Sequence, residues 1–238
     1  MNARPLSWAP GEASEAPLPV GGLAFLACRS GALWLERERL LVVADLHLEK
    51  GSAFAARGRM LPPYDSRATL AALAAVVARF RPATVLVLGD GLHDGRALER
   101  IPAEDLAALR ALQGRADWIW VAGNHDPVAP AGLGGQGCDE IVVGDVAFRH
   151  EPKPGETGPE LAGHLHPAAK VGGRGRAVRR RCFVSNGRRC VMPAFGAYAG
   201  GLNVLDRAFA PLFGARFTAH VAGAERVYTV APAQLRPD

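Results

Sequence analysis

The sequence predicts an α/β fold in which parallel strands with connecting helices form one sheet, and a second, mostly antiparallel sheet packs against it. Residues 40–44, 84–88 and 118–122 are continuous apolar runs, as expected of strands buried on both faces. Helical segments lie between these runs, and the order strand, helix, strand, helix, strand is typical of a layered core with parallel strands. After residue 140 only short apolar runs occur, and none of them predicts a helix. These later runs predict the second sheet.

The amino-terminal part is expected to form an arm and then a hairpin. Residues 1–20 are rich in Pro, Ala and Gly without periodicity, which predicts a loosely ordered arm followed by a single domain over 21–238. Residues 23–28 and 32–35 flank Ser30-Gly31, and this arrangement predicts the hairpin.

Both helices are predicted from their first residues and their apolar spacing. Asp65 and Ser66 can cap the first helix, which ends before Pro82. Pro102 suits the first turn of the second helix and is followed by two acidic residues. The apolar faces consist of Leu70, Leu73, Val77 and Phe80 in the first helix, and of Leu106, Leu109 and Leu112 in the second.

The second sheet is predicted from short runs, several of them separated by Gly or Asn turns. The expected strands cover residues 141–143, 146–149, 182–185, 189–192, 202–205, 217–221 and 227–230. The glycine-rich stretches 132–137 and 172–175 predict surface loops. Neither lies between a strand and a helix, so neither indicates a nucleotide-binding loop.

The composition argues against a membrane protein and a disulfide framework. With 238 residues, 49% of them hydrophobic and 21% charged, the chain can build one substantial core or at most two small domains. No apolar run is long enough to span a bilayer, and the first twenty residues lack the apolar stretch of a signal peptide. The four cysteines form no CxxC pair. We therefore expect a cytoplasmic protein with reduced thiols.

Positive charge is concentrated in one segment. No acidic residue occurs between Glu160 and Asp206, and without the eight cations of that segment the formal net charge falls from +5 to −3. The basicity is therefore local and predicts a surface that faces a partner. The eight cations are Lys170, Arg174, Arg176, Arg179, Arg180, Arg181, Arg188 and Arg189.

Six of the seven histidines fall in five polar clusters between residues 45 and 166. Three clusters directly follow the predicted buried strands, and ligands of such sheets bind beyond the carboxyl ends of the strands. Histidine, aspartate and asparagine are ligands of divalent metals, so the clusters predict one metal site. The clusters are Asp45-Leu-His47, Gly89-Asp90-Gly-Leu-His93, Gly123-Asn124-His125-Asp126, His150 and Gly163-His164-Leu-His166.

Each cluster taken alone has a plainer interpretation. Asp45 could cap a helix beside a surface histidine, Asn124 could be a capping residue, and a His-x-His pair in a turn is common. As a metal site, Asp45 and His47 are expected to point to one side because they lie two apart at a strand end. Asp90 follows a glycine that lets the backbone approach an ion, and its two carboxylate oxygens suit a ligand shared by two cations.

The order of the five clusters resembles the calcineurin-like metallophosphoesterase superfamily, over roughly residues 23–205. The resemblance implies a four-layer α/β/β/α sandwich, with two mixed sheets flanked by helices and a dinuclear metal centre at the sheet edges. It also implies the ligands: Asp45, His47, Asp90 and His166 for the first metal, and Asp90, Asn124, His150 and His164 for the second. The pattern departs from the superfamily at one place: its second aspartate usually comes three residues after the bridging one, whereas Asp94 comes four after Asp90, with His93 between.

Longer motifs resemble one bacterial subfamily, the ligase-associated DNA damage response metallophosphoesterases, which are described as endonucleases. The motifs are Asp45-Leu-His-Leu-Glu-Lys-Gly51, Gly89-Asp-Gly-Leu-His-Asp94, His150-Glu-Pro152, Gly163-His-Leu-His-Pro167 and Met192-Pro-Ala-Phe-Gly196. This resemblance implies a role in DNA repair, and as partners a DNA ligase, a helicase and an exonuclease-like protein encoded beside it.

The expected chemistry is hydrolysis of a phosphodiester by metal-bound hydroxide. His125 is the candidate general acid for the leaving oxygen, with Asp126 orienting its ring. Mixed Asp, His and Asn ligands without thiolate favour Mn²⁺, and leave Fe or Zn²⁺ open.

The arginine-rich segment bears on the substrate. It begins eight residues after His166, so we expect it near the metal site, where glycines would let it flex over a DNA backbone. A solvated loop is the alternative for such a run. Two other functions compete with the DNA phosphodiesterase: a small-molecule nucleotide phosphoesterase of the same fold, and a non-catalytic DNA-binding repair subunit, against which the intact His125 argues. The predicted substrate-binding residues are Arg174, Arg176, Arg179, Arg180 and Arg181.

Overall fold

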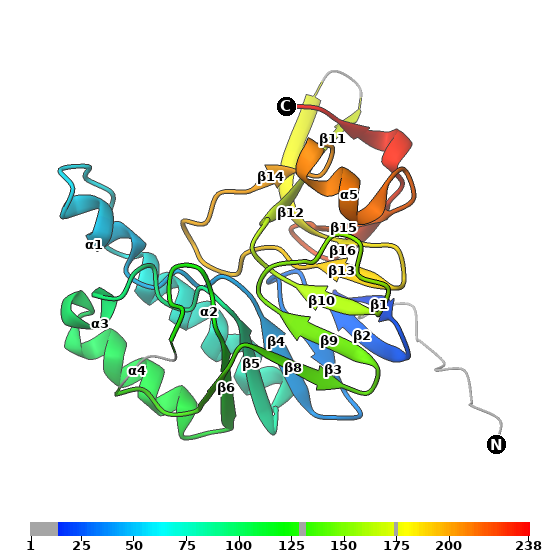
Figure 1. Ribbon diagram of the computed structural model, residues 1–238. Helices are drawn as coiled ribbons and strands as arrows, with labels where there is room; N and C mark the ends of the chain where they lie inside the picture. The colour runs from blue at the N-terminus through cyan, green and yellow to red at the C-terminus, as the bar shows by residue number, and fades with distance from the viewer. Residues whose placement is uncertain (1–13, 129–131, 174–175) are drawn as a thin grey trace.

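A computed structural model of the chain describes residues 14–128, 132–173 and 176–238, arranged as two packed sheets with helices on their outer faces (Figure 1). In the first, seven-stranded sheet, the strands up to β4 pair antiparallel and those from β4 onward pair parallel. The predicted hairpin and all three predicted buried strands are confirmed. In order across the sheet, the strands are β1 (Ala16–Val20), β2 (Leu23–Ala27), β3 (Leu33–Leu35), β4 (Leu40–Val43), β5 (Thr84–Leu88), β6 (Asp117–Val121) and β7 (Gln136–Cys138).

Two helices cover the outer face of this sheet, α2 (Asp65–Phe80) and α4 (Ala103–Gln113), close to their predicted positions. Leu73 of α2 and Leu109 of α4 are fully buried in one cluster with Val85 of β5. Two short helices, α1 (Lys50–Ala55) and α3 (Ala97–Arg100), were not predicted, because neither is long enough to show helical periodicity.

The second sheet has ten strands and is mixed: most pairs are antiparallel, while β9–β10, β10–β13 and β11–β14 are parallel. Phe148 and Phe183 of this sheet pack against Phe25 and Leu86 of the first, which forms the central core. The strands are β8 (Glu140–Val143), β9 (Val146–Arg149), β10 (Glu160–Ala162), β11 (Pro167–Gly173), β12 (Arg176–Ser185), β13 (Arg189–Val191), β14 (Leu202–Asn203), β15 (Thr218–Ala222), β16 (Val227–Val230) and β17 (Leu235–Arg236).

The fourth layer is thin. A 3₁₀ turn (Arg207–Phe209) and the four-residue helix α5 (Ala210–Phe213) place Phe209 and Phe213 on the outer face of the second sheet, against Val184. A second 3₁₀ turn, Pro232–Gln234, precedes β17. The expected α/β/β/α order of layers is therefore confirmed. No helix within the described residues is both long and apolar enough to cross a membrane.

Three boundaries differ from the prediction. Residues 16–20 of the expected arm form β1, in which Leu18 and Val20 are buried while Pro17 and Pro19 face outward. Proline is tolerated there because β1 is an edge strand; residues 1–13 lie outside the described part. The glycine-rich stretches are also partly strands, since β7 begins at Gln136 and β11 runs to Gly173.

A buried cluster of ions joins three strands of the second sheet. Glu160 of β10 is fully buried and accepts a hydrogen bond of 2.9 Å from Arg149 of β9. Its other oxygen contacts the guanidinium of Arg189 in β13, and Arg149 also bonds Glu140 at 2.8 Å. Burial raises the pKa of Glu160, an effect that the two arginines oppose.

We expect Glu160→Gln to lower the free energy of unfolding by about 3 kcal/mol, because it leaves two buried guanidinium groups without their shared countercharge. Urea denaturation measures this loss. The control is Glu104→Gln, which breaks an exposed ion pair with Arg67 and should cost far less. Equal losses for the two variants would contradict the prediction.

Candidate metal centre

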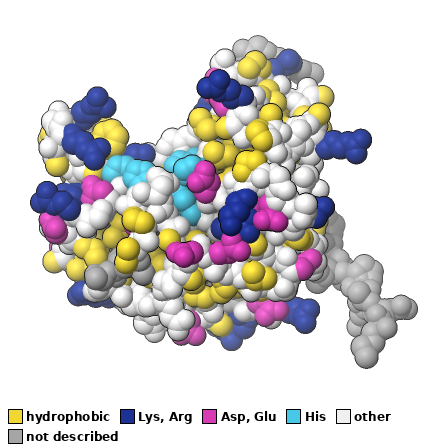
Figure 2. Space-filling view, in the orientation of Figure 1, with side chains coloured by type: hydrophobic (Ala, Val, Ile, Leu, Met, Phe, Trp, Pro, Cys, Tyr) yellow, Lys and Arg dark blue, Asp and Glu magenta, His cyan; other side chains and the backbone are white. Residues whose placement is uncertain are grey.

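The five polar clusters converge at one edge of the two sheets. Three follow the carboxyl ends of β4, β5 and β6, and two follow β9 and β10 of the second sheet. Figure 2 shows histidine side chains at the base of a hollow between two raised parts of the surface. The structure thus brings the predicted ligands together: Asp45, His47, Asp90, Asn124, His150, His164 and His166.

The backbone at this edge is strained. Asp45, His47, Asp90, His164 and His166 all have φ between +45° and +67°, a left-handed conformation that non-glycine residues rarely adopt. Backbone hydrogen bonds hold the first two loops together: His47 N donates to Asp90 O at 2.8 Å, and Asp45 N to Gly89 O at 3.2 Å. Both residues lie beyond β4, so their common direction comes from these turns and not from the strand alternation that we expected.

One group of donors consists of Asp45, His47 and His166. The Nε2 atoms of the two histidines are 3.3 Å apart, and Nε2 of His166 is 3.3 Å from Oδ1 of Asp45. All three ligand atoms lie within 4.8 Å of one another. Burial lowers the pKa of His47 to about 2, so this imidazole is neutral, as a metal ligand must be.

A second group consists of Asn124, His150 and His164. Nδ1 of His150 lies 3.0 Å from the carbonyl oxygen of Leu88, which can only accept, so this nitrogen carries the proton. Nε2 of His150 then presents a lone pair to Oδ1 of Asn124 at 2.8 Å and to Nδ1 of His164 at 3.2 Å. Electron pairs that face one another in this way fit a cation between them.

Asp90 lies between the two groups. Its Oδ2 is 3.5 Å from Nε2 of His150 and 3.8 Å from Nε2 of His47, while its Oδ1 accepts a 2.9 Å hydrogen bond from the backbone N–H of His125. A carboxylate in this position could act as a ligand for a cation on either side. The residues present therefore fit the two ions that the resemblance implies.

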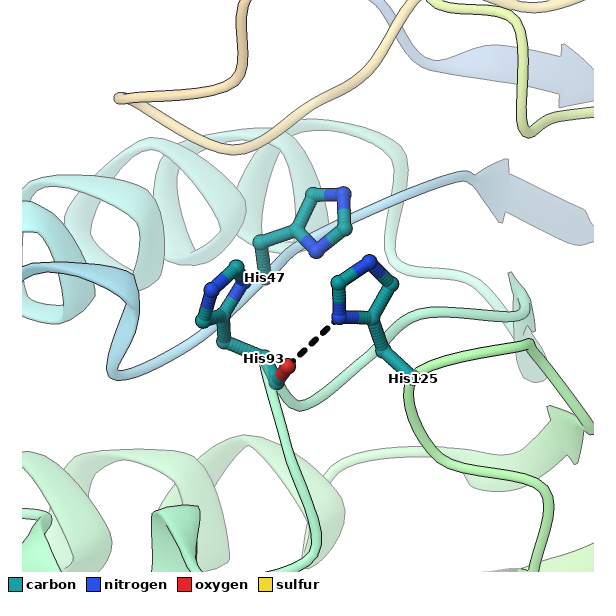
Figure 3. A group of neighbouring side chains, drawn as sticks. All are labelled: His47, His93 and His125. Carbon is teal, nitrogen blue, oxygen red and sulfur yellow. Dashed lines mark hydrogen bonds between the residues drawn. The ribbon is translucent and has the colours of Figure 1, made fainter. Parts of the chain in front are cut away.

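His125 lies at the rim of the same cluster (Figure 3). Its Nδ1 is 2.7 Å from the carbonyl oxygen of His93, and its ring stacks on the His93 ring at a centroid distance of 4.9 Å. With Nδ1 donating to that carbonyl, Nε2 remains for a substrate, 4.0 Å from Oδ2 of Asp90 and on a side chain that is 36% exposed. His47, His93 and His125 also form a group whose nitrogens could hold a metal.

The predicted role of Asp126 is wrong. Its carboxylate accepts a 2.9 Å hydrogen bond from the backbone N–H of Leu92, and burial raises its pKa to about 6. It therefore stabilises the loop after β5, while the His93 carbonyl orients the His125 ring. Asp94 bonds Arg100 at 2.8 Å and the backbone N–H of Arg96 at 2.9 Å, and so holds the start of α3.

The family model for calcineurin-like phosphoesterases matches residues 38–188. The chain belongs to this family. As a calcineurin-like phosphoesterase, it is a hydrolase of phosphoesters whose fold implies divalent metal ions.

One solved structure agrees with this membership. The crystal structure of nuclease MPE from Pseudomonas putida is 31% identical to the chain, covers 91% of it and 100% of the nuclease, and gives a TM-score of 0.70. Yfce, a phosphoesterase from E. coli, is 13% identical over 81% of the chain and 98% of its own, with a TM-score of 0.39. No curated protein matches the chain significantly. The likeness to nuclease MPE is consistent with the subfamily that the longer motifs resemble.

Four of the five predicted substrate-binding arginines of this phosphoesterase, residues 176, 179, 180 and 181, lie on β12 of the β11–β12 hairpin instead of a flexible loop. Arg174 and the side chain of Arg176 lie outside the described part of the chain. Arg179 pairs with Asp238 at 3.2 Å, and Arg180 is exposed.

Arg181 points back into the protein, which contradicts a substrate-binding role. Its Nη1 lies 3.1–3.3 Å from the carbonyl oxygens of Ser30, Ala194 and Phe195, and burial lowers its pKa. The segment that it supports bonds the first metal loop, since Phe195 N donates to Ala44 O at 2.8 Å. Arg181 therefore supports the site from behind.

We expect Asp90→Asn to weaken the binding of divalent metal by more than tenfold, because even partners outside the ligand set change metal affinity about 10–100-fold. Metal content after gel filtration, measured by mass spectrometry, tests this. Asp94→Asn is the matched control and should retain its metal, since that carboxylate bonds only α3 groups. Undiminished metal in Asp90→Asn would rule out a central role for Asp90.

Proposed function

We propose that the protein is a metal-dependent phosphodiesterase that cleaves DNA, with a role in DNA repair. The observation that carries this proposal is the partly buried set of converging nitrogen and oxygen atoms, with the partly exposed His125 beside it. The 31% identity to nuclease MPE over the whole length of that nuclease supports the choice of a nucleic acid as the substrate.

In this proposal, two ions share Asp90. Asp45, His47 and His166 would hold the first with it, and Asn124, His150 and His164 the second. When bound, divalent ions would offset the charge of the phosphate and lower the pKa of a water molecule. The set contains carboxylates, imidazoles and one amide but no thiolate, which supports Mn²⁺ ahead of Fe or Zn²⁺.

His125 would protonate the leaving oxygen. Its Nδ1 proton is held by the His93 carbonyl, so the proton that it transfers is on Nε2, the nitrogen at the rim. When the leaving oxygen takes this proton, the ring becomes neutral and must regain a proton from water before the next turnover.

The proposal extends to the setting of the protein. Its four free cysteines suit a cytoplasmic location. The subfamily resemblance supports a DNA ligase, a helicase and an exonuclease-like protein as partners in repair.

We expect His125→Ala to slow DNA cleavage by about 10²–10⁴-fold, the usual contribution of a general acid. Metal content should stay the same, because the ligand atoms belong to other side chains. Hydrolysis of bis-p-nitrophenyl phosphate should fall much less, since nitrophenolate leaves without needing a proton. An undiminished rate of DNA cleavage would disprove the assigned role.

A substrate panel tests the function itself. The protein with added Mn²⁺ is assayed on single-stranded DNA, bis-p-nitrophenyl phosphate and p-nitrophenyl phosphate. We expect cleavage of the first two. Strong hydrolysis of the monoester without DNA cleavage would favour a small-molecule phosphoesterase, and metal and DNA binding without hydrolysis would favour a non-catalytic subunit.

A further inference from the structure

A projecting segment forms one wall of the hollow above the histidines. This segment, residues 50–64, comprises α1 and the chain that leads to α2, and we call it the α1 arm (Figure 1). In the space-filling view, Lys and Arg side chains cover the raised part of the surface where α1 lies, beside the histidines (Figure 2). The ring centroid of Phe54 in α1 lies 5.9 Å from that of His93, so the arm contacts the ring that stacks on His125.

The arm is tied down at its base. Gly51 N donates to Oδ2 of Asp65 at 3.0 Å, which joins the start of α1 to the start of α2. Ser66 accepts from the backbone N–H of Glu49 at 2.8 Å and donates to its carboxylate at 2.6 Å, in a buried pair. Arg100 of α3 donates to Ser52 at 3.0 Å. The position of the arm relative to the site is therefore built into the fold.

The outer surface of the arm carries charge without counterions. Arg57 and Arg59 are exposed, Lys50 is half-buried, and the arm contains no acidic residue. Within the described part of the chain, none of these three cations forms an ion pair. An anionic partner would offset this local excess of positive charge.

Two large apolar side chains of the same arm are also uncovered, and both are close to the two arginines in the sequence. Met60 is 83% exposed and Tyr64 is 62% exposed. Arginines interleaved with an exposed aromatic ring are the usual means by which proteins bind single-stranded nucleic acid: the cations contact phosphates and the ring stacks on a base. The surface therefore has groups that can contact both the phosphate and the base of a nucleotide.

We propose that the α1 arm binds the nucleic-acid strand next to the scissile phosphate. Arg57 and Arg59 contact flanking phosphates, and Tyr64, with Met60 beside it, packs against an unpaired base. This inference rests on the proposed nuclease function. It assigns to the arm the positioning of a polymeric substrate, which the metal cluster alone does not provide.

The test compares Tyr64→Ala and Tyr64→Phe on a single-stranded oligonucleotide. Loss of stacking should raise KM for DNA about five- to 150-fold in the alanine variant, the equivalent of about 1–3 kcal/mol at 1.4 kcal/mol per tenfold. The phenylalanine variant keeps the ring and should retain the parent value. Oligonucleotides in which abasic sites replace the bases near the cut should raise KM for the parent enzyme. They should not raise KM further for Tyr64→Ala, which has already lost the stacking ring.

The arginines are tested by salt dependence. In Arg57→Ala/Arg59→Ala, the plot of log kcat/KM for DNA against log salt should become less steep by about 0.7 per lost phosphate contact. The ratio of DNA cleavage to bis-p-nitrophenyl phosphate hydrolysis should fall at least about tenfold. Arg37→Ala is the matched control, because that side chain is 90% exposed and lies in the turn that precedes β4, at the opposite end of the strand from Asp45.

The outcomes separate the two proposals. A parent enzyme that cuts DNA, with arm variants that cut it equally well, would overturn the role of the arm alone. A parent enzyme that hydrolyses bis-p-nitrophenyl phosphate but never DNA would overturn the nuclease function, and this inference with it. A lower ratio of DNA cleavage to bis-p-nitrophenyl phosphate hydrolysis in the arm variants, with Arg37→Ala unaffected, would support the nuclease function and the role of the arm.

Discussion

Electron pairs that converge without a proton between them are the constraint on which the rest of this structure depends. His150 donates the proton on its Nδ1 to Leu88 O, so in this tautomer its Nε2 faces the Asn124 oxygen at 2.8 Å as one acceptor opposite another. The Nε2 atoms of His47 and His166 also approach each other, at 3.3 Å. Opposed acceptors repel each other, and a divalent cation between them turns this repulsion into attraction. The protein must therefore hold these side chains in an arrangement that they would not adopt by themselves.

Several kinds of contact in the fold hold these side chains in place. Left-handed residues cost roughly 1–3 kcal/mol each, and the loops that contain Asp45 and Asp90 persist because backbone hydrogen bonds join them. Behind them, Arg181 holds the segment that bonds the first loop. Beneath His150, the neighbouring Arg149 is anchored in the ion cluster of Glu160. The hydrophobic core between the two sheets stabilises the fold that holds these strained loops in place.

Much of this could be predicted from the sequence, because buried strands and polar clusters leave local patterns. The runs that became β4, β5 and β6 were identified, and with them the edge where Asp45, Asp90 and Asn124 lie. Other features leave no such pattern. A backbone carbonyl, that of His93, orients the His125 ring, and any residue type could supply it. Similarly, nothing local distinguishes the inward Arg181 from the exposed Arg180, because only the surrounding fold decides which side of β12 is covered.

Hydrophobic periodicity predicts the metal ligands of the site but misses the elements that surround them. The proposed ligands come from the ends of buried strands, whose positions are fixed by the core and whose chemistry suits a single phosphate group of any ester. We therefore expect selection among phosphoesters to come from elements outside this set: α1 is a short helix outside the parallel core, and β12 belongs to a long hairpin of the second sheet. Such elements are set by tertiary contacts, for example Ser66 with Glu49 at the base of α1. Changes in these elements are consequently expected to alter the choice of substrate without altering the metal centre.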